Sequence, residues 1–370
     1  MHQEPARVMF VYWGRRGAMT QFTLQLARAA LAHPCLIPTI SVSRQNERFD
    51  SFCDLGSRLF PMDTFRTGAG AVLEAWRLPF LRRRFRDRLR QDRIEAVIEL
   101  MPHVWSPLLM PVARTVGARY CTIVHDAVAH PGDPTGWIKL LTDPSLRSVD
   151  LAFTLSAAAA TRLRARNIIA PGKIVTLFTP DLRYGGHTQR MPPKPGEPLR
   201  LLFLGRILPY KGLSLFVDMV ETLRRGGIAT EVGVFGEGPL GANAERLSAM
   251  NAEVVNRWLA EEEFGAILSR FHAVVLSHTE ASQSGVAAAA LGAGLPIIVT
   301  PVGGLVEQVS CGKNGIIADE LNPRALAEAA KRLLLDPVLY RSICDNISKF
   351  AEQRAMAHFV EIILSQALRI

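Results

Sequence analysis

The sequence has 370 residues, of which 48% are hydrophobic and 21% charged, a balance typical of globular proteins. Because this length is too great for one ordinary core, two domains are expected. The net charge of +9 suggests an anionic partner, but nucleic acid is not favoured, because basic residues are not interleaved with aromatic ones and no binding motif is present.

The first half of the chain alternates short apolar runs with helical stretches. Residues 8–13 predict a buried strand, and residues 18–32 predict the helix that follows it. Strands separated by helices pair in parallel, so this half predicts a doubly wound α/β sheet. The further strands predicted here are 35–42, 94–100, 120–126 and 149–156.

Positive charge is most concentrated in WRLPFLRRRFRDRLRQDR, residues 76–93. On a helix, four residues would form a rough apolar side, while arginines cover the rest. Three interpretations stay open: a solvated helix with snorkelling arginines, a patch over Arg77–Arg93 that rests on an anionic membrane surface, and a nucleic-acid contact. The apolar side consists of Phe80, Leu81, Phe85 and Leu89.

A second alternating half follows GGHTQRMPPKPGEP, residues 185–198, whose glycines and prolines predict a linker. Residues 199–205 predict a strand, and residues 212–227 predict a helix from apolar residues at i, i+3, i+4, i+7 and i+10. These apolar residues are Leu213, Phe216, Val217, Val220 and Leu223. The strands that complete a second parallel sheet are 230–236, 272–278 and 296–301.

The domain organisation follows from these elements. We expect residues 1–186 to form an N-terminal Rossmann-like domain, 187–198 the linker and 199–350 a C-terminal domain of the same type. Residues 351–370 form a C-terminal helix, and packing on the N-terminal domain is one option for it. Ligands are expected at the carboxyl ends of the strands, in a cleft between the domains.

Cysteine usage and the N-terminus bear on location. Five cysteines are scattered without a C-x-x-C pair, so neither a disulfide framework nor a zinc site is expected. The start MHQEPARVMF does not read as a signal peptide, and no window has the roughly 18 apolar residues that span a bilayer. We expect a cytoplasmic protein, with peripheral attachment to the inner membrane face as an option.

Two stretches of the second half predict anion binding. In FLGRILPYKG, residues 203–212, Arg206 and Lys211 follow a strand and precede a helix, where two cations can neutralise a diphosphate; a surface cation pair here is also a common structural accident. In TEASQSGV, residues 279–286, the small residues after Glu280 predict a helix start whose amides stay open to an anion.

Three other loops are weaker candidates. Gly14 and Gly17 form a glycine turn too loose for a dinucleotide motif and without a Walker lysine, so a plain strand–helix connection is equally expected. Glu307 follows a Gly-Gly turn, and taken alone it could be simply a first-turn acidic residue that complements a helix dipole. His125 ends a strand near Asp126, His130 and Asp133, but this spacing matches no standard metal site, and no metal is expected.

Taken in order, GRILPYKG, VFGEGP, HAVVLSHTEASQSGVAAAALGAGLPIIVTPVGGLVEQV and KNGIIA strongly resemble the C-terminal half of family 4 glycosyltransferases. The resemblance covers nearly all of residues 199–320, and the SQSGV-like loop is similar to that of one branch. The first half resembles the family more faintly, through Gly14–Gly17, HD at 125–126 and TLS at 154–156. The resemblance implies the GT-B fold, with residues 1–186 as the acceptor-side domain and residues 199–350 as the nucleotide-sugar-binding domain, and it implies retaining transfer.

Site roles follow from the resemblance residue by residue. Arg206 and Lys211 match the pair that holds the donor diphosphate, and Glu280 matches the first glutamate of a paired motif, placed against the donor-sugar hydroxyls. The second glutamate falls at Ala288 or Ala289, so this sequence departs from the family there. The remaining matches are the loop amides of Ser284, Gly285 and Val286, the acidic Glu307 and the acceptor-domain histidine His125.

The implied function is transfer of a sugar from a nucleotide-diphosphate sugar to a glycan or lipid-linked glycan, without metal or other cofactor. A front-face displacement would need no enzymic nucleophile, because cations and helix amides stabilise the leaving diphosphate. Bacterial surface polysaccharide or glycolipid assembly is the expected setting by family analogy. Two alternatives stay open: a nucleotide-sugar epimerase of the same fold, and a non-catalytic nucleotide-sugar-binding protein.

Overall fold

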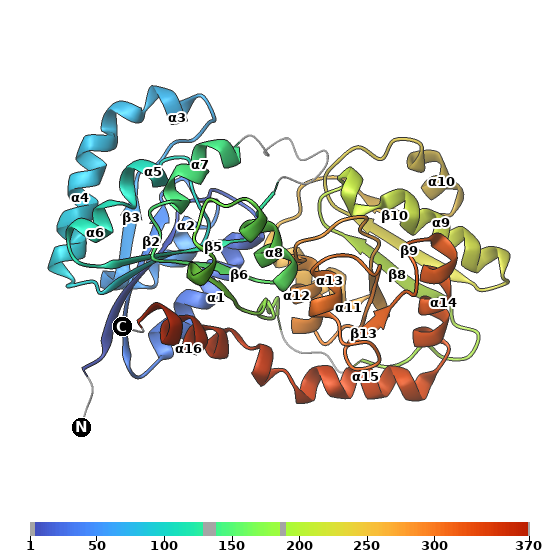
Figure 1. Ribbon diagram of the computed structural model, residues 1–370. Coiled ribbons are helices and arrows are strands. Elements are labelled where there is room, and N and C mark those ends of the chain that lie inside the picture. The colour runs from blue at the N-terminus through green and yellow to red at the C-terminus, as the bar shows by residue number, and fades with distance from the viewer. Residues whose placement is uncertain (1–3, 129–137, 186–189, 369–370) are drawn as a thin grey trace. The chain divides into compact units, whose positions relative to one another are not determined.

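The computed structural model describes residues 4–128, 138–185 and 190–368 (Figure 1). They form two compact units. Unit 1 contains the described residues up to 128, residues 138–178 and those from Met356 onward, and unit 2 contains those of Thr179–Ala355. The chain thus enters unit 2 before the linker predicted at 187–198, of which residues 187–189 lie outside the described part.

Unit 1 is built on a seven-stranded parallel sheet with the order β3-β2-β1-β4-β5-β6-β7. β1 is central, pairing with β2 from Ala6↔Leu36 to Tyr12↔Val42 and with β4 on its other side. Its residues 8–12 are fully buried, which explains a continuous apolar run without alternation. The strands are β1 (Ala6–Tyr12), β2 (Leu36–Ser43), β3 (Leu59–Met62), β4 (Ala96–Glu99), β5 (Arg119–Val124), β6 (Leu151–Thr154) and β7 (Ile174–Thr176).

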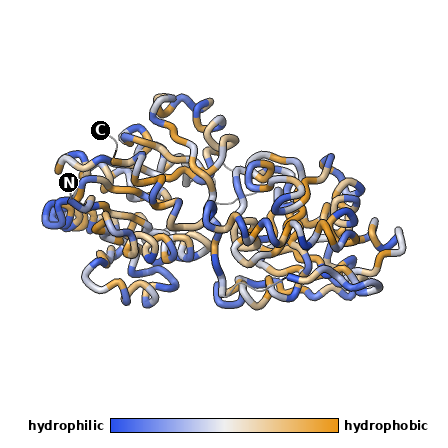
Figure 2. Tube along the Cα trace, turned by 90° about the horizontal axis from the view of Figure 1, so that it is seen from below, coloured by the Kyte–Doolittle hydropathy of each residue, from blue (hydrophilic) through white to orange (hydrophobic). Residues whose placement is uncertain are grey.

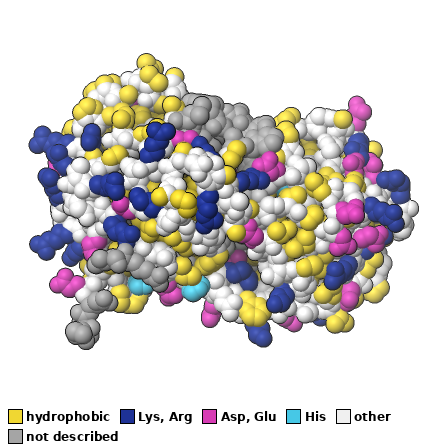
Figure 3. All heavy atoms as spheres, in the orientation of Figure 1, with side chains coloured by type: hydrophobic (Ala, Val, Ile, Leu, Met, Phe, Trp, Pro, Cys, Tyr) yellow, Lys and Arg dark blue, Asp and Glu magenta, His cyan; other side chains and the backbone are white. Residues whose placement is uncertain are grey.

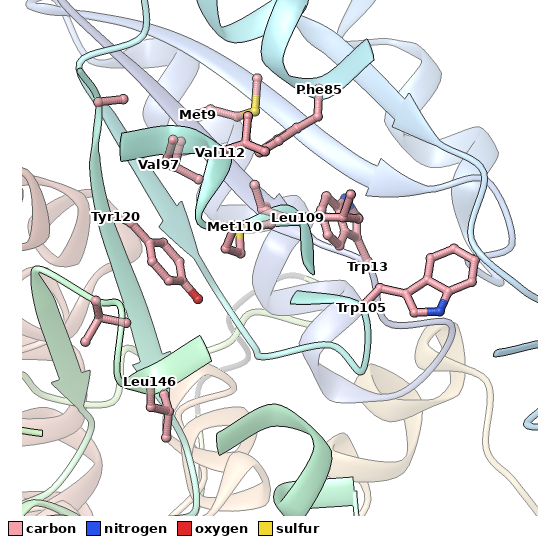
Figure 4. Close-up of a cluster of buried hydrophobic side chains, with 14 of the residues drawn as sticks. Met9, Trp13, Phe85, Val97, Trp105, Leu109, Met110, Val112, Tyr120 and Leu146 are labelled. Atoms are coloured by element: carbon pink, nitrogen blue, oxygen red, sulfur yellow. The ribbon is translucent and has the colours of Figure 1, made fainter. Parts of the chain in front are cut away.

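The apolar face of the arginine-rich helix seals one side of this sheet. Leu81, Phe85 and Leu89 belong to the same buried cluster as Met9 of β1, and the Phe85 ring meets Trp13 edge-on with 5.8 Å between centroids (Figure 4). The helices described in unit 1 are α1 (Ala18–Ala32), α2 (Phe49–Cys53), α3 (Gly70–Leu73), α4 (Leu78–Gln91), α5 (Ser106–Leu109), α6 (Val112–Thr115), α7 (Ile138–Leu146), α8 (Ala157–Ala165) and α16 (Met356–Ala367).

The sequence predicted that Phe80 belongs to the apolar side of α4, and this prediction is wrong. Its side chain is 68% exposed, whereas Leu81, one position further along α4, is 1% exposed. Successive helix positions are separated by about 100°, so a three-residue stripe at i, i+4 and i+8 is enough to dock α4 and leaves Phe80 outside it.

Unit 2 is a six-stranded parallel sheet with the order β10-β9-β8-β11-β12-β13. In both units the inner segments are the hydrophobic ones (Figure 2). The strands are β8 (Leu199–Leu204), β9 (Thr230–Phe235), β10 (Glu253–Val255), β11 (Ala273–Leu276), β12 (Ile297–Val299) and β13 (Gly315–Ile317). The helices described here are α9 (Leu213–Arg225), α10 (Asn243–Ala249), α11 (Glu261–Ser269), α12 (Gly285–Gly292), α13 (Leu305–Gln308), α14 (Pro323–Leu334) and α15 (Pro337–Lys349).

The helix predicted over residues 212–227 is confirmed as α9, and all five of its expected core residues are buried. Residues 351–370, in contrast, are not one helix: a 3₁₀ turn, Glu352–Arg354, precedes α16. α16 packs on α1 of unit 1, where the Phe22 and Phe359 rings lie 5.6 Å apart and Arg119 donates to the Ala367 carbonyl at 2.7 Å.

Candidate active site

The carboxyl edge of the unit 2 sheet carries most of the predicted site residues. The strand order reverses between β8 and β11, which are neighbours in the sheet although β9 and β10 separate them in sequence. Ligands of open α/β sheets bind at such switch points. The loop after β8 carries Arg206 and Lys211, and the loop after β11 carries Glu280 and Ser284. The structure therefore brings these four residues to one edge of one sheet.

Backbone contacts join these two loops. The Thr279 amide donates to the Tyr210 carbonyl at 2.9 Å. The Ser277 hydroxyl donates to the Gly212 carbonyl at 2.8 Å. Gly212 has a φ of 70°, and a Cβ there would lie 1.9 Å from the Ser277 carbonyl oxygen. Glycine next to Lys211 is thus what allows the loops to approach each other.

Lys211 is half-buried and held by aromatic neighbours. Its ammonium donates to Nε2 of His278 at 2.8 Å and lies 5.2 Å from the centroid of the Tyr210 ring. Because an ammonium can only donate, Nε2 of His278 accepts, and the ring is neutral with its proton on Nδ1.

The amino end of α12 lies at the same edge. Ser284 caps the helix, its hydroxyl accepting from the Ala287 amide at 3.3 Å. Within the part of the chain that the structure describes, the amides of Gly285 and Val286 have no hydrogen-bond acceptor. The first amides of a helix carry partial positive charge and attract anions. This end of α12 therefore has the donors that the sequence predicts.

Arg206 lies beside this helix end. A Cβ on Gly205 would lie 3.2 Å from Cγ2 of Val286, so the residue before Arg206 packs on the first turn of α12. A Cβ on Gly236, after β9, would in turn lie 2.0 Å from the Gly205 carbonyl oxygen. The Arg206 side chain is exposed. Close backbone packing thus sets the position of this exposed arginine.

Gln308 of α13 is a residue that the sequence analysis missed. Its Oε1 accepts from the Ser284 amide at 2.6 Å, and its Nε2 donates to the Ser284 carbonyl at 3.1 Å. The neighbouring Gly304 amide donates to the Ala281 carbonyl at 3.0 Å, which joins the same two loops. Glu307, the predicted acidic residue, is exposed in the single turn of α13. Gln308 therefore orients the cap of α12.

We expect Gln308→Leu to weaken donor binding and folding by comparable amounts. Loss of both hydrogen bonds frees the Ser284 turn, which should raise KM for the donor about tenfold. The free energy of unfolding should fall by about 1–2 kcal/mol. Donor titrations together with thermal unfolding measure the two effects. Gln308→Glu is the matched variant: it keeps the acceptor for the Ser284 amide and loses the donor to its carbonyl, so an intermediate KM is expected. An unchanged KM in both variants would contradict the role.

In unit 1, the glycine turn lies after β1, where the strand order reverses between β1 and β4. The Gly17 amide donates to Oε1 of Glu47 at 2.9 Å, and the side-chain amide of Asn46 donates to the Gly14 carbonyl at 2.9 Å. A Cβ on Gly14 would lie 2.4 Å from the Tyr12 hydroxyl. These contacts give the turn a packing role as a strand–helix connection, and its substrate contact stays a prediction.

His125 follows β5 at the same edge of the unit 1 sheet. Its Nε2 donates to the Leu100 carbonyl at 2.8 Å, and its ring meets Phe22 edge-on with 6.3 Å between centroids. Because a carbonyl only accepts, Nε2 carries a proton. His130 and Asp133, grouped with it by sequence, lie outside the described residues.

A buried carboxyl group beneath this edge was also missed. Glu99 ends β4 with no exposed surface, and it accepts from the hydroxyls of Ser106, Tyr120 (2.6 Å) and Thr122 (3.2 Å). Burial raises its pKa to about 7, although these hydrogen bonds act in the opposite direction. Since hydroxyl donors surround it, Glu99 serves as a structural tie of the sheet edge.

Sequence comparisons point in one direction. Residues 198–336 match the family model described as Glycosyl transferases group 1. A 2-deoxystreptamine glucosyltransferase of Streptomyces kanamyceticus is 26% identical over 296 residues, which are 73% of this chain and 76% of that protein. A GDP-mannose-dependent phosphatidylinositol monomannoside mannosyltransferase of Mycolicibacterium smegmatis is 27% identical over 260 residues, 62% of this chain and 65% of that protein.

Solved structures share the whole architecture. Anabaena Alr3699/HepE in complex with UDP-glucose superposes with a TM-score of 0.69 at 12% identity, covering 98% of this chain and 99% of that one. The TarM G117R mutant of S. aureus superposes with a TM-score of 0.70 at 10% identity, covering 98% of this chain and 100% of that one. With two parallel α/β sheets of seven and six strands, the fold is GT-B.

Proposed function

We propose that this chain, a group 1 glycosyltransferase of the GT-B fold, moves a sugar from a nucleoside diphosphate to an acceptor hydroxyl with retention of the anomeric configuration. We assign it to family 4, in the branch with an SQSGV-like loop, Ser282–Val286. One observation carries the proposal: Lys211, Arg206 and the open amides of α12 meet at the switch point of a single sheet.

In the proposed reaction, the bond between the anomeric carbon and the diphosphate oxygen breaks, and a bond from that carbon to the acceptor oxygen forms on the same face. The acceptor hydroxyl loses its proton to the departing diphosphate. Charge builds up on the leaving group, so donors fixed around it lower the barrier, each by about 3–4 kcal/mol where such groups have been removed in other enzymes.

Different residues are assigned to the diphosphate and to the sugar of the donor. Lys211 and Arg206 balance the diphosphate charge, and the Gly285 and Val286 amides donate to its oxygens. Glu280 orients the donor sugar by accepting hydrogen bonds from the hydroxyl groups of the sugar. No side chain is needed as a nucleophile, and the cations take the role that a metal ion has in other transferases.

The ribose must be held without the second family glutamate. Ala288 and Ala289 are each only 1% exposed, on a part of α12 that faces the interior of unit 2. Their positions cannot supply a hydrogen bond from a side chain. We therefore propose that backbone groups hold the ribose.

For the acceptor we propose a glycan or a lipid-linked glycan of a bacterial surface polysaccharide or glycolipid pathway, made at the cytoplasmic face of the membrane. The names of several relatives support this class, among them the phosphatidylinositol monomannoside mannosyltransferase and a colanic acid biosynthesis glycosyltransferase of Salmonella typhimurium, 25% identical over 191 residues. His125 and the Gly14–Gly17 turn, in unit 1, are the proposed acceptor-side residues.

Incubation with a panel of UDP- and GDP-sugars tests the reaction. We expect one donor to raise the unfolding temperature and to be cleaved without added metal, even in the presence of EDTA. NMR of an early product should show the anomeric configuration of the donor. An inverted product, recovery of the donor with an epimerised sugar, or binding without turnover would each contradict the proposal and identify its replacement.

A further inference from the structure

Unit 1 exposes a compact set of large apolar side chains before and at the start of α4. Their exposed fractions are 78% for Val72, 74% for Leu73, 78% for Trp76 and 68% for Phe80. Hydrophobic side chains gather over α3 in the space-filling view, and Lys and Arg follow along the side where α4 lies (Figure 3). We call these four residues the apolar tip. Single exposed apolar residues are ordinary, but a cluster marks an interaction surface.

The apolar tip is not a displaced piece of core. Leu81, Phe85 and Leu89 already seal α4 against the sheet, and Gly70 at the start of α3 is buried. Trp105 also donates from its indole nitrogen to the Ala71 carbonyl at 3.0 Å, so the α3 backbone is tied to the core. The tip therefore points outward from a firmly anchored segment.

Positive charge adjoins the apolar tip. α4 contains six arginines and a single aspartate, and Arg82 and Arg83 are exposed. Arg88 forms a close ion pair with Asp92 at 2.6 Å, whereas the pairs of Arg83 and Arg84 are longer, 3.8 Å to Asp87 and 3.9 Å to Asp63. Exposed pairs of this kind are weak, so they compete poorly with an anionic surface.

A groove of about 480 Å³ connects the two features. It runs between α4 and the edge strand β3, and Phe80 of the apolar tip forms part of its wall. Its other walls are Leu59, Phe60, Pro61, Arg83, Arg84, Asp87, Arg88 and Gln91, so three arginines line it beside a single carboxylate. The Arg84 and Arg88 guanidinium carbons lie 5.1 Å and 5.5 Å from the centroid of the Phe60 ring. The groove thus combines apolar walls with guanidinium groups, which suits an anionic headgroup on an apolar tail.

We propose that the apolar tip inserts into the surface of an anionic lipid bilayer, with Arg82, Arg83 and Arg84 at the level of the lipid phosphates. Phe80 precedes Arg83 and Arg84 by about one helical turn, roughly 5 Å of rise, which matches the few ångströms between the acyl boundary and the phosphates. The aromatic and aliphatic side chains of the apolar tip would thus contact the acyl chains, and the arginines behind them would contact the lipid phosphates. The surface lies on unit 1 alone and is independent of the transfer reaction.

Sedimentation with vesicles tests the proposal on the full chain. We expect binding to vesicles of phosphatidylcholine with 30% phosphatidylglycerol, and little binding to phosphatidylcholine alone. Trp76→Ser with Phe80→Ser should lower the partition coefficient at least tenfold. Arg82→Gln and Arg83→Gln should each lower it about fivefold and flatten its salt dependence.

Matched controls come from unit 2. Leu335 and Val338 are 55% and 74% exposed, and Arg324 and Arg341 are exposed as well. Leu335→Ser with Val338→Ser removes exposed apolar side chains elsewhere, and Arg324→Gln and Arg341→Gln each remove one positive charge elsewhere, so binding should stay within about twofold. Thermal unfolding of each variant verifies that the fold is intact.

Insertion has its own readout. Lipids brominated on the acyl chains should quench tryptophan emission of the parent protein, and Trp76→Phe should remove most of that quenching while still binding. Three results would overturn the proposal: equal binding to neutral and anionic vesicles, unchanged binding after loss of the apolar tip, or no quenching. A parent dimer that becomes monomeric in the Trp76→Ser, Phe80→Ser variant would assign the surface to a second copy instead.

Discussion

Lys211→Ala is expected to lower kcat for transfer at least a hundredfold while leaving the fold intact. The Lys211 ammonium is a fixed cation at the switch point of unit 2, with its position set by His278 at 2.8 Å and by the Tyr210 ring. A charge that meets the leaving diphosphate acts mainly in the transition state, where the negative charge is largest, so kcat should fall more than KM rises. A hundredfold effect corresponds to about 2.7 kcal/mol.

Two further variants test whether the loss comes from the charge and the position of Lys211. Lys211→Arg keeps the charge but changes the length and geometry of the donor, so a smaller loss, about tenfold, is expected. Lys349→Ala is the matched control, because Lys349 also lies over an aromatic ring, 5.6 Å from the Phe350 centroid, but on α15. Steady-state kinetics and thermal unfolding of all three are compared. Near-normal turnover by Lys211→Ala would end the assignment of the diphosphate site.

Gly212→Ala is expected to destabilise unit 2 by several kcal/mol, about 3–5, and to lower turnover as well. The new Cβ would lie 1.9 Å from the Ser277 carbonyl oxygen, a backbone atom that cannot rotate away. The φ of 70° adds the cost of a left-handed conformation for a residue with a side chain. To relieve the contact the β8 and β11 loops must separate, which displaces Lys211.

Gly227→Ala separates collision from backbone strain. Gly227 also has a positive φ, 79°, but its added Cβ would meet nothing within 4 Å. Only the left-handed conformation is then penalised, at about 1–2 kcal/mol. Differential scanning calorimetry should show a fall in unfolding temperature of at least about 6 °C for Gly212→Ala and a few degrees for Gly227→Ala. Equal shifts would mean that the loops separate without cost.

Long, periodic elements could be predicted from the sequence, and short strands only where they lie inside a longer apolar run. α1 has the predicted bounds, and β1, β2 and β9 lie within one or two residues of theirs. β3, β7, β10 and β13, of three or four residues each, were not predicted as strands. β4, β6, β11 and β12 are equally short but lie inside the longer runs 94–100, 149–156, 272–278 and 296–301, which were predicted. Short segments outside such runs carry too few positions for a period of two to be visible.

In the candidate site, residues that follow strand ends could be predicted, and residues whose roles depend on distant contacts could not. The loops that carry Arg206, Lys211 and Ser284 were found, because ligands collect where strands end beside helix starts. Gln308 and His278 were not singled out, since their roles depend on contacts with residues 24 and 67 positions away. Glu99 was also missed, because inside a buried strand nothing in the sequence marks a carboxyl group surrounded by hydroxyls. Partners distant in sequence are a property of the folded chain.

The route of the chain through the two units has a consequence for biosynthesis. The described residues of unit 2 all lie within Thr179–Ala355, whereas unit 1 receives α16 only after them. During synthesis, the residues of unit 2 therefore leave the ribosome before α16 does. At that stage α1 still lacks the helix whose Phe359 packs on Phe22. Nascent chains should complete unit 2 first, and during that interval a chaperone would find its binding surface on α1.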